Sequence, residues 1–213
     1  APAKTIFWFP TDGGGHLPLN CESILQKCYY PIAMSKFGQK QALEVHGIKT
    51  DYIPHAVNHE MFHPLPQEEK DKIRMKWGLY GKFVVGMVGR NQGRKMNDRV
   101  IKAFAKWCKN HEDAILLLHC DPYDNAAVFD IVRLITMFGI QNRVRFTGTK
   151  FHKGFTYSQM NEVYNLFDIY LSTTSGEGFG ICTLESMSCE IPVLNTAYTT
   201  TDELVTNYNS GEA

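Results

Sequence analysis

Short apolar runs alternate with amphipathic segments along most of the chain after residue 82. Phe83–Val88 and Ala114–Cys120 are almost continuously apolar, which is typical of parallel strands buried on both faces. Residues 97–111, between them, repeat apolar positions at helical spacing and carry Lys and Arg on the other face. The alternation continues with predicted helices over 131–138, 158–167, 180–189 and 202–207, and predicted strands over 144–148, 168–173 and 192–196. This pattern predicts an α/β fold with a doubly wound, Rossmann-like parallel sheet, whose ligand crevice lies at the carboxyl ends of the strands.

The first part of the chain shows less of this pattern. Residues 30–34 and 52–54 are predicted strands that flank a predicted helix over 36–46. One such unit is too small to form a domain by itself. We therefore expect residues 1–67 to hold the end of a preceding domain and an interdomain linker, and residues 68–213 to form the Rossmann-like domain. The chain is expected to be a fragment.

Composition disfavours several classes of protein. The 22 Lys and Arg balance the 22 Asp and Glu, so nothing indicates a bulk nucleic-acid binder. No apolar run approaches the roughly 20 residues that span a bilayer. The six cysteines include no CxxC pair, and the chain has no N-x-[ST] sequon. We therefore expect a reduced, cytoplasmic location, with peripheral membrane association left open.

A glycine-rich basic turn follows the first apolar run. It reads Gly86-Met-Val-Gly89-Arg90-Asn-Gln-Gly-Arg-Lys95. Exposed amides, a helix N-terminus and the charges of Arg90 and Lys95 are suited to an anion such as a diphosphate. A surface turn with solvated cations is the alternative. The glycine spacing fits neither a nicotinamide-binding fingerprint nor a P-loop.

A second glycine-rich loop precedes the predicted helix over 180–189. It reads Ser-Gly-Glu177-Gly178-Phe179-Gly180, and Glu185 follows within the helix. Because about two helical turns separate the loop from Glu185, both carboxylates can face one crevice. Carboxylates in such a place accept hydrogen bonds from sugar or ribose hydroxyls. The alternative is a capped helix with one solvated glutamate.

These motifs resemble the C-terminal half of retaining GT-B glycosyltransferases, in particular the large family, usually numbered four, that transfers sugars from nucleotide diphosphates. The resemblance rests on the basic turn, on EGFG with seven residues between its glutamate and the next, and on the following Pro192-Val193. Upstream, SKFG at 35–38, IPHAVN at 53–58 and FHP at 62–64 resemble further family segments. The resemblance to the family extends from about Tyr29 to Glu212.

The resemblance implies roles for individual residues. Arg90 and Lys95 would bind the donor diphosphate and stabilise it as leaving group, and Glu177 would hold hydroxyls of the donor sugar; these three are the implied catalytic residues. Glu185 would bind the ribose. The other implied donor-binding residues are Gly89, Gly178, Phe179 and Gly180, with Lys150 and Phe151 near the base. The family needs no metal and no cofactor. Glu190 departs from the family, which usually has a glycine there as a left-handed helix cap.

Three further features of the sequence admit more than one interpretation. His55, His59 and His63 are spaced like helical metal ligands, but prolines bracket them, so a zinc site is disfavoured. The segment TDGGGH at 11–16 is either a site loop of the preceding domain or a flexible turn. The cations at 99, 102 and 106 are expected to form a solvated helix face.

The expected protein is therefore a retaining, metal-independent glycosyltransferase that moves a hexose from a UDP- or GDP-sugar to an acceptor hydroxyl. The acceptor is a glycan, a lipid or a small molecule, and no nucleic acid is expected as a partner. Most of the acceptor site would lie in a missing N-terminal domain. The alternatives are a nucleotide-sugar epimerase or hydrolase, a non-catalytic nucleotide-sugar-binding module and, more distantly, a Rossmann oxidoreductase.

Overall fold

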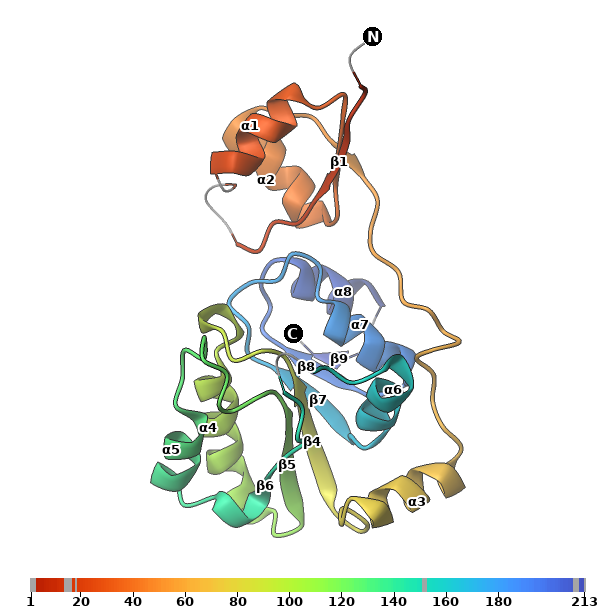
Figure 1. Ribbon diagram of the computed structural model, residues 1–213, viewed down its shortest axis with the longest axis vertical. Helices are drawn as coiled ribbons and strands as arrows, with labels where there is room; N and C mark the ends of the chain where they lie inside the picture. The colour runs from red at the N-terminus through yellow and green to blue at the C-terminus, as the bar shows by residue number, and fades with distance from the viewer. Residues whose placement is uncertain (1–2, 14–16, 18, 151–152, 209–210, 213) are drawn as a thin grey trace.

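The larger part of the molecule is a parallel sheet. The computed structural model describes residues 3–13, 17, 19–150, 153–208 and 211–212 (Figure 1). Within them, six parallel strands follow the order β6-β5-β4-β7-β8-β9. The strands are β4 (Phe83–Val88), β5 (Ala114–His119), β6 (Val144–Phe146), β7 (Ile169–Ser172), β8 (Val193–Asn195) and β9 (Gly211–Glu212). The strand order reverses between β4 and β7, so the topological switch point lies there.

Helices cover this sheet on both faces, as Figure 1 shows. They are α3 (Gln67–Lys76), α4 (Asn97–Trp107), α5 (Ile131–Met137), α6 (Tyr157–Asn165), α7 (Ile181–Ser188) and α8 (Thr200–Tyr208). Val84 and Val88 of β4 belong to a core shared with α6 and α8, whereas Val85 and Met87 belong to a second core shared with α4 and α5. Alternate side chains of one strand therefore enter opposite cores. This burial explains the continuous apolar run and confirms the predicted fold class.

A smaller unit precedes the large sheet. Its parallel strands are β1 (Ile6–Phe9), β2 (Tyr30–Ala33) and β3 (Asp51–Tyr52), and its helices are α1 (Leu19–Lys27) and α2 (Lys36–His46). Ser35 caps α2 by accepting the backbone N–H of Gly38 on its Oγ, and Gly47 ends the helix with a φ of 67°. Phe9, Leu25 and Ala42 belong to its core.

Residues 53–66 join the two units without helix or strand. The sequence pattern did not predict β1, α1, α3 or β9. Other boundaries shift by a few residues; the helix predicted over 97–111 ends at Trp107 and continues as a 3₁₀ turn, Cys108–Asn110. Among the described helices, none combines the length and apolar character that crossing a bilayer requires.

Specific contacts hold the smaller unit against the large sheet. The Glu203 carboxylate on α8 accepts the backbone N–H groups of Lys36 and Phe37 at the start of α2, each at 3.2 Å. The His55 ring lies between two aromatic rings, 4.1 Å from that of Trp8 and 5.2 Å from that of Phe179 between centroids. The loop after β7 therefore faces the N-terminal unit directly.

Candidate functional site

Two loops meet at the switch point of the large sheet. One follows β4 and contains the 3₁₀ turn η1 (Gly93–Lys95), and the other follows β7 and runs to the start of α7. The Arg94 carbonyl oxygen ties them together, because it accepts the Ser175 backbone N–H at 2.7 Å and the Thr174 hydroxyl at 3.1 Å. The basic turn and the glutamate loop predicted from the sequence thus form one structure.

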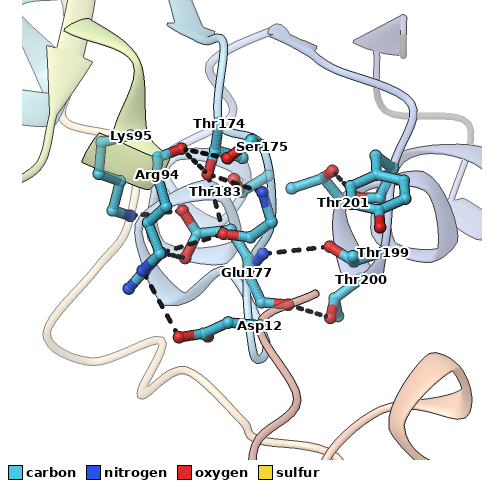
Figure 2. Close-up of polar contacts among 12 residues, drawn as sticks. Asp12, Arg94, Lys95, Thr174, Ser175, Glu177, Thr183, Thr199, Thr200 and Thr201 are labelled. Atoms are coloured by element: carbon cyan, nitrogen blue, oxygen red, sulfur yellow. Dashed lines mark hydrogen bonds and ion pairs between the residues drawn. The ribbon is translucent and has the colours of Figure 1, made fainter. Parts of the chain in front are cut away.

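Glu177 lies at the centre of this structure and contacts two cations (Figure 2). Its Oε1 lies 2.5 Å from Nζ of Lys95, and its Oε2 lies 2.8 Å from Nη1 of Arg94. Arg94 also donates to the Gly176 carbonyl at 3.1 Å and lies 3.5 Å from the Asp12 carboxylate. The Lys95 and Glu177 side chains are only 13% and 9% exposed, so this pair is poorly screened by solvent.

The charges around Glu177 favour its ionised form. Burial by itself raises the pKa of a carboxyl group, but the nearby Lys95 and Arg94 outweigh burial, and the pKa of Glu177 lies below its ordinary value. Glu177 is therefore a carboxylate at neutral pH. In such a cluster a ligand's phosphates can pair with the two cations while its hydroxyls donate hydrogen bonds to the carboxylate.

The glycines beside Glu177 leave room for another part of the chain. A Cβ at Gly176 would lie 1.6 Å from the Asp12 carbonyl oxygen, and one at Gly178 would lie 2.5 Å from Cβ of Pro10. In the structure, the segment around Pro10–Asp12 therefore approaches the backbone at both glycines. This segment belongs to the TDGGGH candidate, of which residues 14–16 lie outside the described part of the chain.

The positions after Gly178 begin a helix. Phe179 is buried, with 6% of its side chain exposed, and its ring faces His55. Gly180 caps α7 with a φ of 90°, a left-handed conformation that favours glycine. The N-terminus of α7 therefore starts directly behind the glutamate loop.

Arg90 lies in a neighbouring part of the crevice, where it pairs with Asp124. It forms a two-point ion pair with Asp124, at 2.5 Å from Nε and 3.2 Å from Nη2, and its hydrogen bond lowers the pKa of that carboxyl group. Arg90 and Gly89 line a pocket of about 180 Å³ together with Lys150. This pocket lies at the carboxyl ends of β4 and β5. Phe151 lies outside the described residues.

His119 at the end of β5 lines the same pocket. Burial lowers its pKa to about 4, so the ring is neutral at pH 7. One ring nitrogen lies 2.9 Å from the Thr147 hydroxyl, and the Phe155 ring packs edge-on against it. A neutral, fixed imidazole can form hydrogen bonds with a ligand without adding charge.

Glu185 on α7 has a different environment from Glu177. The Tyr164 hydroxyl donates to its Oε2 at 2.5 Å, and burial raises the pKa of Glu185 despite this hydrogen bond. Burial raises the pKa of the nearby Cys182 thiol; Lys95 lowers it, and both glutamates raise it further. Glu177 thus has two cationic partners, whereas the described hydrogen bond of Glu185 is with a neutral phenol.

No group of three or more His, Cys, Asp and Glu side chains suited to a metal ion occurs within the described part of the chain. The three histidines of the linker have separate surroundings. His55 lies between aromatic rings, and Nδ1 of His59 lies 2.9 Å from the Ser188 hydroxyl. All six cysteines are free thiols.

The sequence pattern did not single out Arg94 or Thr199 as parts of this site, whereas Asp12 belongs to the TDGGGH candidate. Arg94 was read only as one of several cations in the turn, although it is the neighbour of Lys95. Thr199 Oγ1 accepts the Glu177 backbone N–H at 3.1 Å from a turn 22 residues away in sequence. No local pattern encodes these contacts, because each joins segments that are distant along the chain.

Comparison with known proteins adds a family and a fold. A family model described as glycosyl transferases group 1 matches residues 69–213. The GPI3 subunit of phosphatidylinositol N-acetylglucosaminyltransferase from Saccharomyces cerevisiae is 28% identical over 144 residues, which are 68% of this chain and 29% of that protein. Alpha-galactosylglucosyldiacylglycerol synthase from Streptococcus pneumoniae is 29% identical over 154 residues, 68% of this chain and 37% of that protein. The chain thus spans about a third of these relatives' length.

Solved structures resemble almost the whole chain. HepE of Anabaena, determined with UDP, has a TM-score of 0.80 at 20% identity and covers 98% of this chain and 57% of that one. A glycosyltransferase from Rickettsia africae has a TM-score of 0.78 at 21% identity, with 97% and 55% covered. At these identities the likeness concerns the fold, which is the GT-B arrangement expected from the sequence.

Proposed function

Because the chain belongs to the glycosyl transferases group 1 family, we propose that it provides the nucleotide-sugar-binding part of a retaining, metal-independent glycosyltransferase. The reaction moves a hexose from a UDP- or GDP-sugar to an acceptor hydroxyl. The observation that carries this proposal is the buried contact of Glu177 with Lys95 and Arg94 at the switch point of the sheet. Such a crevice is where open α/β sheets bind nucleotides.

The cations of the site are proposed to form ion pairs with the donor diphosphate in place of their carboxylate partners. Lys95 and Arg90 lie on the loop after β4, and a diphosphate beside that loop would attract both charges. When Lys95 turns to the phosphates, Oε1 of Glu177 becomes available to accept a hydroxyl of the donor sugar. Positive side chains then stabilise the charge that develops on the leaving diphosphate, a role that metal ions fill in other transferases. This supports a reaction without a metal cofactor.

The nucleoside is proposed to bind beside the pocket at the ends of β4 and β5. Lys150 and the neutral His119 line this pocket and offer polar contacts to a base. Glu185 is proposed to bind the ribose, since it lies on α7 about two helical turns beyond the loop that holds Glu177. That HepE, a protein of the same fold, was determined with UDP is consistent with a uridine nucleotide as one of the two candidate donors.

The acceptor is proposed to be a glycan, a lipid or a small molecule that binds mainly to a domain preceding this chain. Two curated relatives are named for phosphatidylinositol and diacylglycerol, which keeps a lipid among the candidates. Both walls of a two-domain cleft are needed to orient two reactants. The 213-residue chain by itself is therefore expected to bind the donor but to transfer sugar poorly.

Calorimetric titration tests the proposal directly. UDP, GDP, UDP-glucose and GDP-mannose are titrated in the presence of EDTA, and at least one nucleotide and its sugar are expected to bind. Lys95→Ala should weaken this binding by about 10- to 150-fold, the effect of losing a charge-assisted hydrogen bond. Lys102→Ala, on the exposed face of α4, is the matched control and should bind like the wild type. If the wild type binds none of the four ligands, the proposed function is wrong.

A further inference from the structure

A strained threonine lies directly behind Glu177. Thr199 has a φ of 57°, in the left-handed region, although it is β-branched and therefore poorly suited to that conformation. It is also buried, with 7% of its surface exposed. A residue of this kind persists only where the surrounding structure holds it in place.

Two hydroxyl groups of this turn hold the Glu177 backbone from both sides. The Oγ1 of Thr199 accepts the Glu177 N–H at 3.1 Å, and the Oγ1 of Thr200 donates to the Glu177 carbonyl oxygen at 2.7 Å. Figure 2 shows both threonines on the side of Glu177 opposite Arg94. The start of α8 therefore fixes the main chain of the residue whose side chain contacts Lys95.

This support matters because the loop around Glu177 is flexible by composition. Glycines precede and follow Glu177, and the segment around Asp12 leaves no room for side chains at either glycine. Glycines also remove the restriction that a Cβ places on the backbone. Without an external contact, the Glu177 carboxylate would sample many orientations relative to Lys95.

We propose that Thr199 and Thr200 are positioning residues, which fix the backbone of Glu177 so that its carboxylate meets the hydroxyls of the donor sugar. This inference rests on the proposed function and assigns the strained turn before α8 a part in recognising the sugar rather than the nucleotide. Thr201 provides an internal comparison. Its hydroxyl donates to the Thr196 and Tyr198 carbonyl oxygens, and so supports the same turn without contacting Glu177.

Substitutions at Thr199 separate the roles of hydroxyl and backbone. Thr199→Gly removes the hydroxyl and relieves the left-handed conformation, whereas Thr199→Ser retains the hydroxyl. UDP and UDP-glucose, or GDP and GDP-mannose if the wild type prefers guanine, are titrated against each variant. We expect Thr199→Gly to bind the nucleotide-sugar about fivefold more weakly while its affinity for the free nucleotide is unchanged, since one neutral hydrogen bond is lost. Thr199→Ser should bind both ligands like the wild type.

Two further variants complete the test. Thr200→Val should reproduce the selective loss of nucleotide-sugar affinity, and Thr201→Val should lower the unfolding temperature without changing the ratio of the two affinities. Thermal unfolding of Thr199→Gly, expected at or above the wild-type temperature, shows that its loss of affinity does not come from unfolding. If Thr199→Gly binds the nucleotide-sugar as tightly as the wild type, or loses both ligands equally, the inference is wrong. If the wild type binds neither ligand, the proposed function is wrong, and this inference is rejected with it.

Discussion

Glu177 carries its negative charge in a place where burial alone would oppose it. Its carboxylate is ionised because Lys95 and Arg94 lie within 2.8 Å of its oxygens. The pKa of Glu177 therefore lies below the ordinary value of 4.5. A lowered carboxyl pKa stabilises the folded state above the unfolded pKa, and this contribution is lost as pH falls through the folded pKa.

Glu177→Gln tests this linkage. At pH 7 the variant should be about 1.5–3 kcal/mol less stable than the wild type, since it loses charge-assisted hydrogen bonds to two cations. The difference should begin to shrink as pH falls below about 4.5, where the carboxyl group of the unfolded chain takes up a proton, and should be lost as pH falls through the lower pKa of the folded state. Urea unfolding at a series of pH values measures it. Glu44→Gln, on an exposed pair with Lys40, should change little at any pH; a difference for Glu177→Gln that stays constant down to pH 3 would contradict the argument.

Glu190 occupies a position whose backbone conformation favours glycine. It follows α7 with a φ of 59°, where the family resemblance predicted a left-handed cap that usually holds glycine. The conformation is thus confirmed even though the residue differs. The left-handed conformation destabilises a non-glycine residue by roughly 1 kcal/mol.

Glu190→Gly should therefore stabilise the protein by about 0.5–1 kcal/mol. Glycine adopts the left-handed conformation without steric strain, although its freedom in the unfolded chain offsets part of the gain. Chemical denaturation measures the change. Glu190→Ala retains the Cβ and should show no such gain, and equal stabilisation by both variants would show that the side chain, not the backbone, is responsible.

The sequence predicted which loops form the candidate site, but not which of their side chains form ion pairs with each other. Lys95 and Glu177 lie on loops that follow buried strands, and parallel strands bring such loops to one edge of the sheet. Arg90 was expected beside Lys95, yet its contacts include Asp124 on a different loop. Which of several adjacent cations faces a carboxylate depends on the course of a short 3₁₀ turn, and no periodic pattern specifies that course. Whether Arg90 binds the diphosphate stays a prediction.

Among the elements, the buried strands were predictable because packing determines their composition. Helix α2 was predicted over its full length, since Ser35 and Gly47 mark its two ends. Helix α3 was not, because it contains no buried residue and so lacks an apolar stripe. Strand β9 has two residues, too few for any alternation to appear. A helix or strand can thus be predicted from the sequence to the extent that its side chains contribute to a core.

Strand β4 contains a position where packing, and not a turn, requires glycine. A Cβ at Gly86 would lie 2.2 Å from Cγ of Phe167, whose ring is 2% exposed. Gly86→Ala should destabilise the protein by about 1–3 kcal/mol, because the ring must move within a close-packed core. Gly154→Ala, at a site with no neighbour within 4 Å, is the control for equilibrium unfolding.

A second substitution identifies the cause. Phe167→Leu removes the ring atoms that the new methyl group would meet. In the Gly86→Ala background it should cost less than it does alone, so the two changes should couple by at least about 0.5 kcal/mol. Strict additivity of the two changes would show that Gly86 is required for another reason.

At the scale of the whole molecule, several contacts join the N-terminal part of the chain to the larger unit, and two of them lie at the site. Asp12 contacts Arg94, Phe179 packs against His55, and Glu203 caps α2. The first two contacts involve the loops that hold Glu177, so movement of the N-terminal unit would change the surroundings of Glu177. The third is separate from the site and uses the N-terminal end of a helix, where backbone N–H groups favour a carboxylate.

Glu203 therefore offers a way to loosen the two units without touching the glutamate loop. Glu203→Gln should weaken the cap on α2 by about 1 kcal/mol, because a neutral amide replaces a carboxylate that accepts two backbone N–H groups. The amides of Lys36 and Phe37 should then exchange with solvent about fivefold faster, as measured by hydrogen exchange.

Asp202→Asn is the matched control, since Asp202 lies next to Glu203 on α8 and accepts the Thr206 hydroxyl. It should leave exchange at Lys36 and Phe37 unchanged. If the cap joins the two units in solution, the backbone amides near Asp12 and His55 should also exchange faster in Glu203→Gln. The reason is that two units released at one contact are held less firmly at the other contacts. Faster exchange confined to Lys36 and Phe37 would mean that Glu203 stabilises only the helix end. Unchanged exchange throughout would show that the contact between α8 and α2 does not persist in solution.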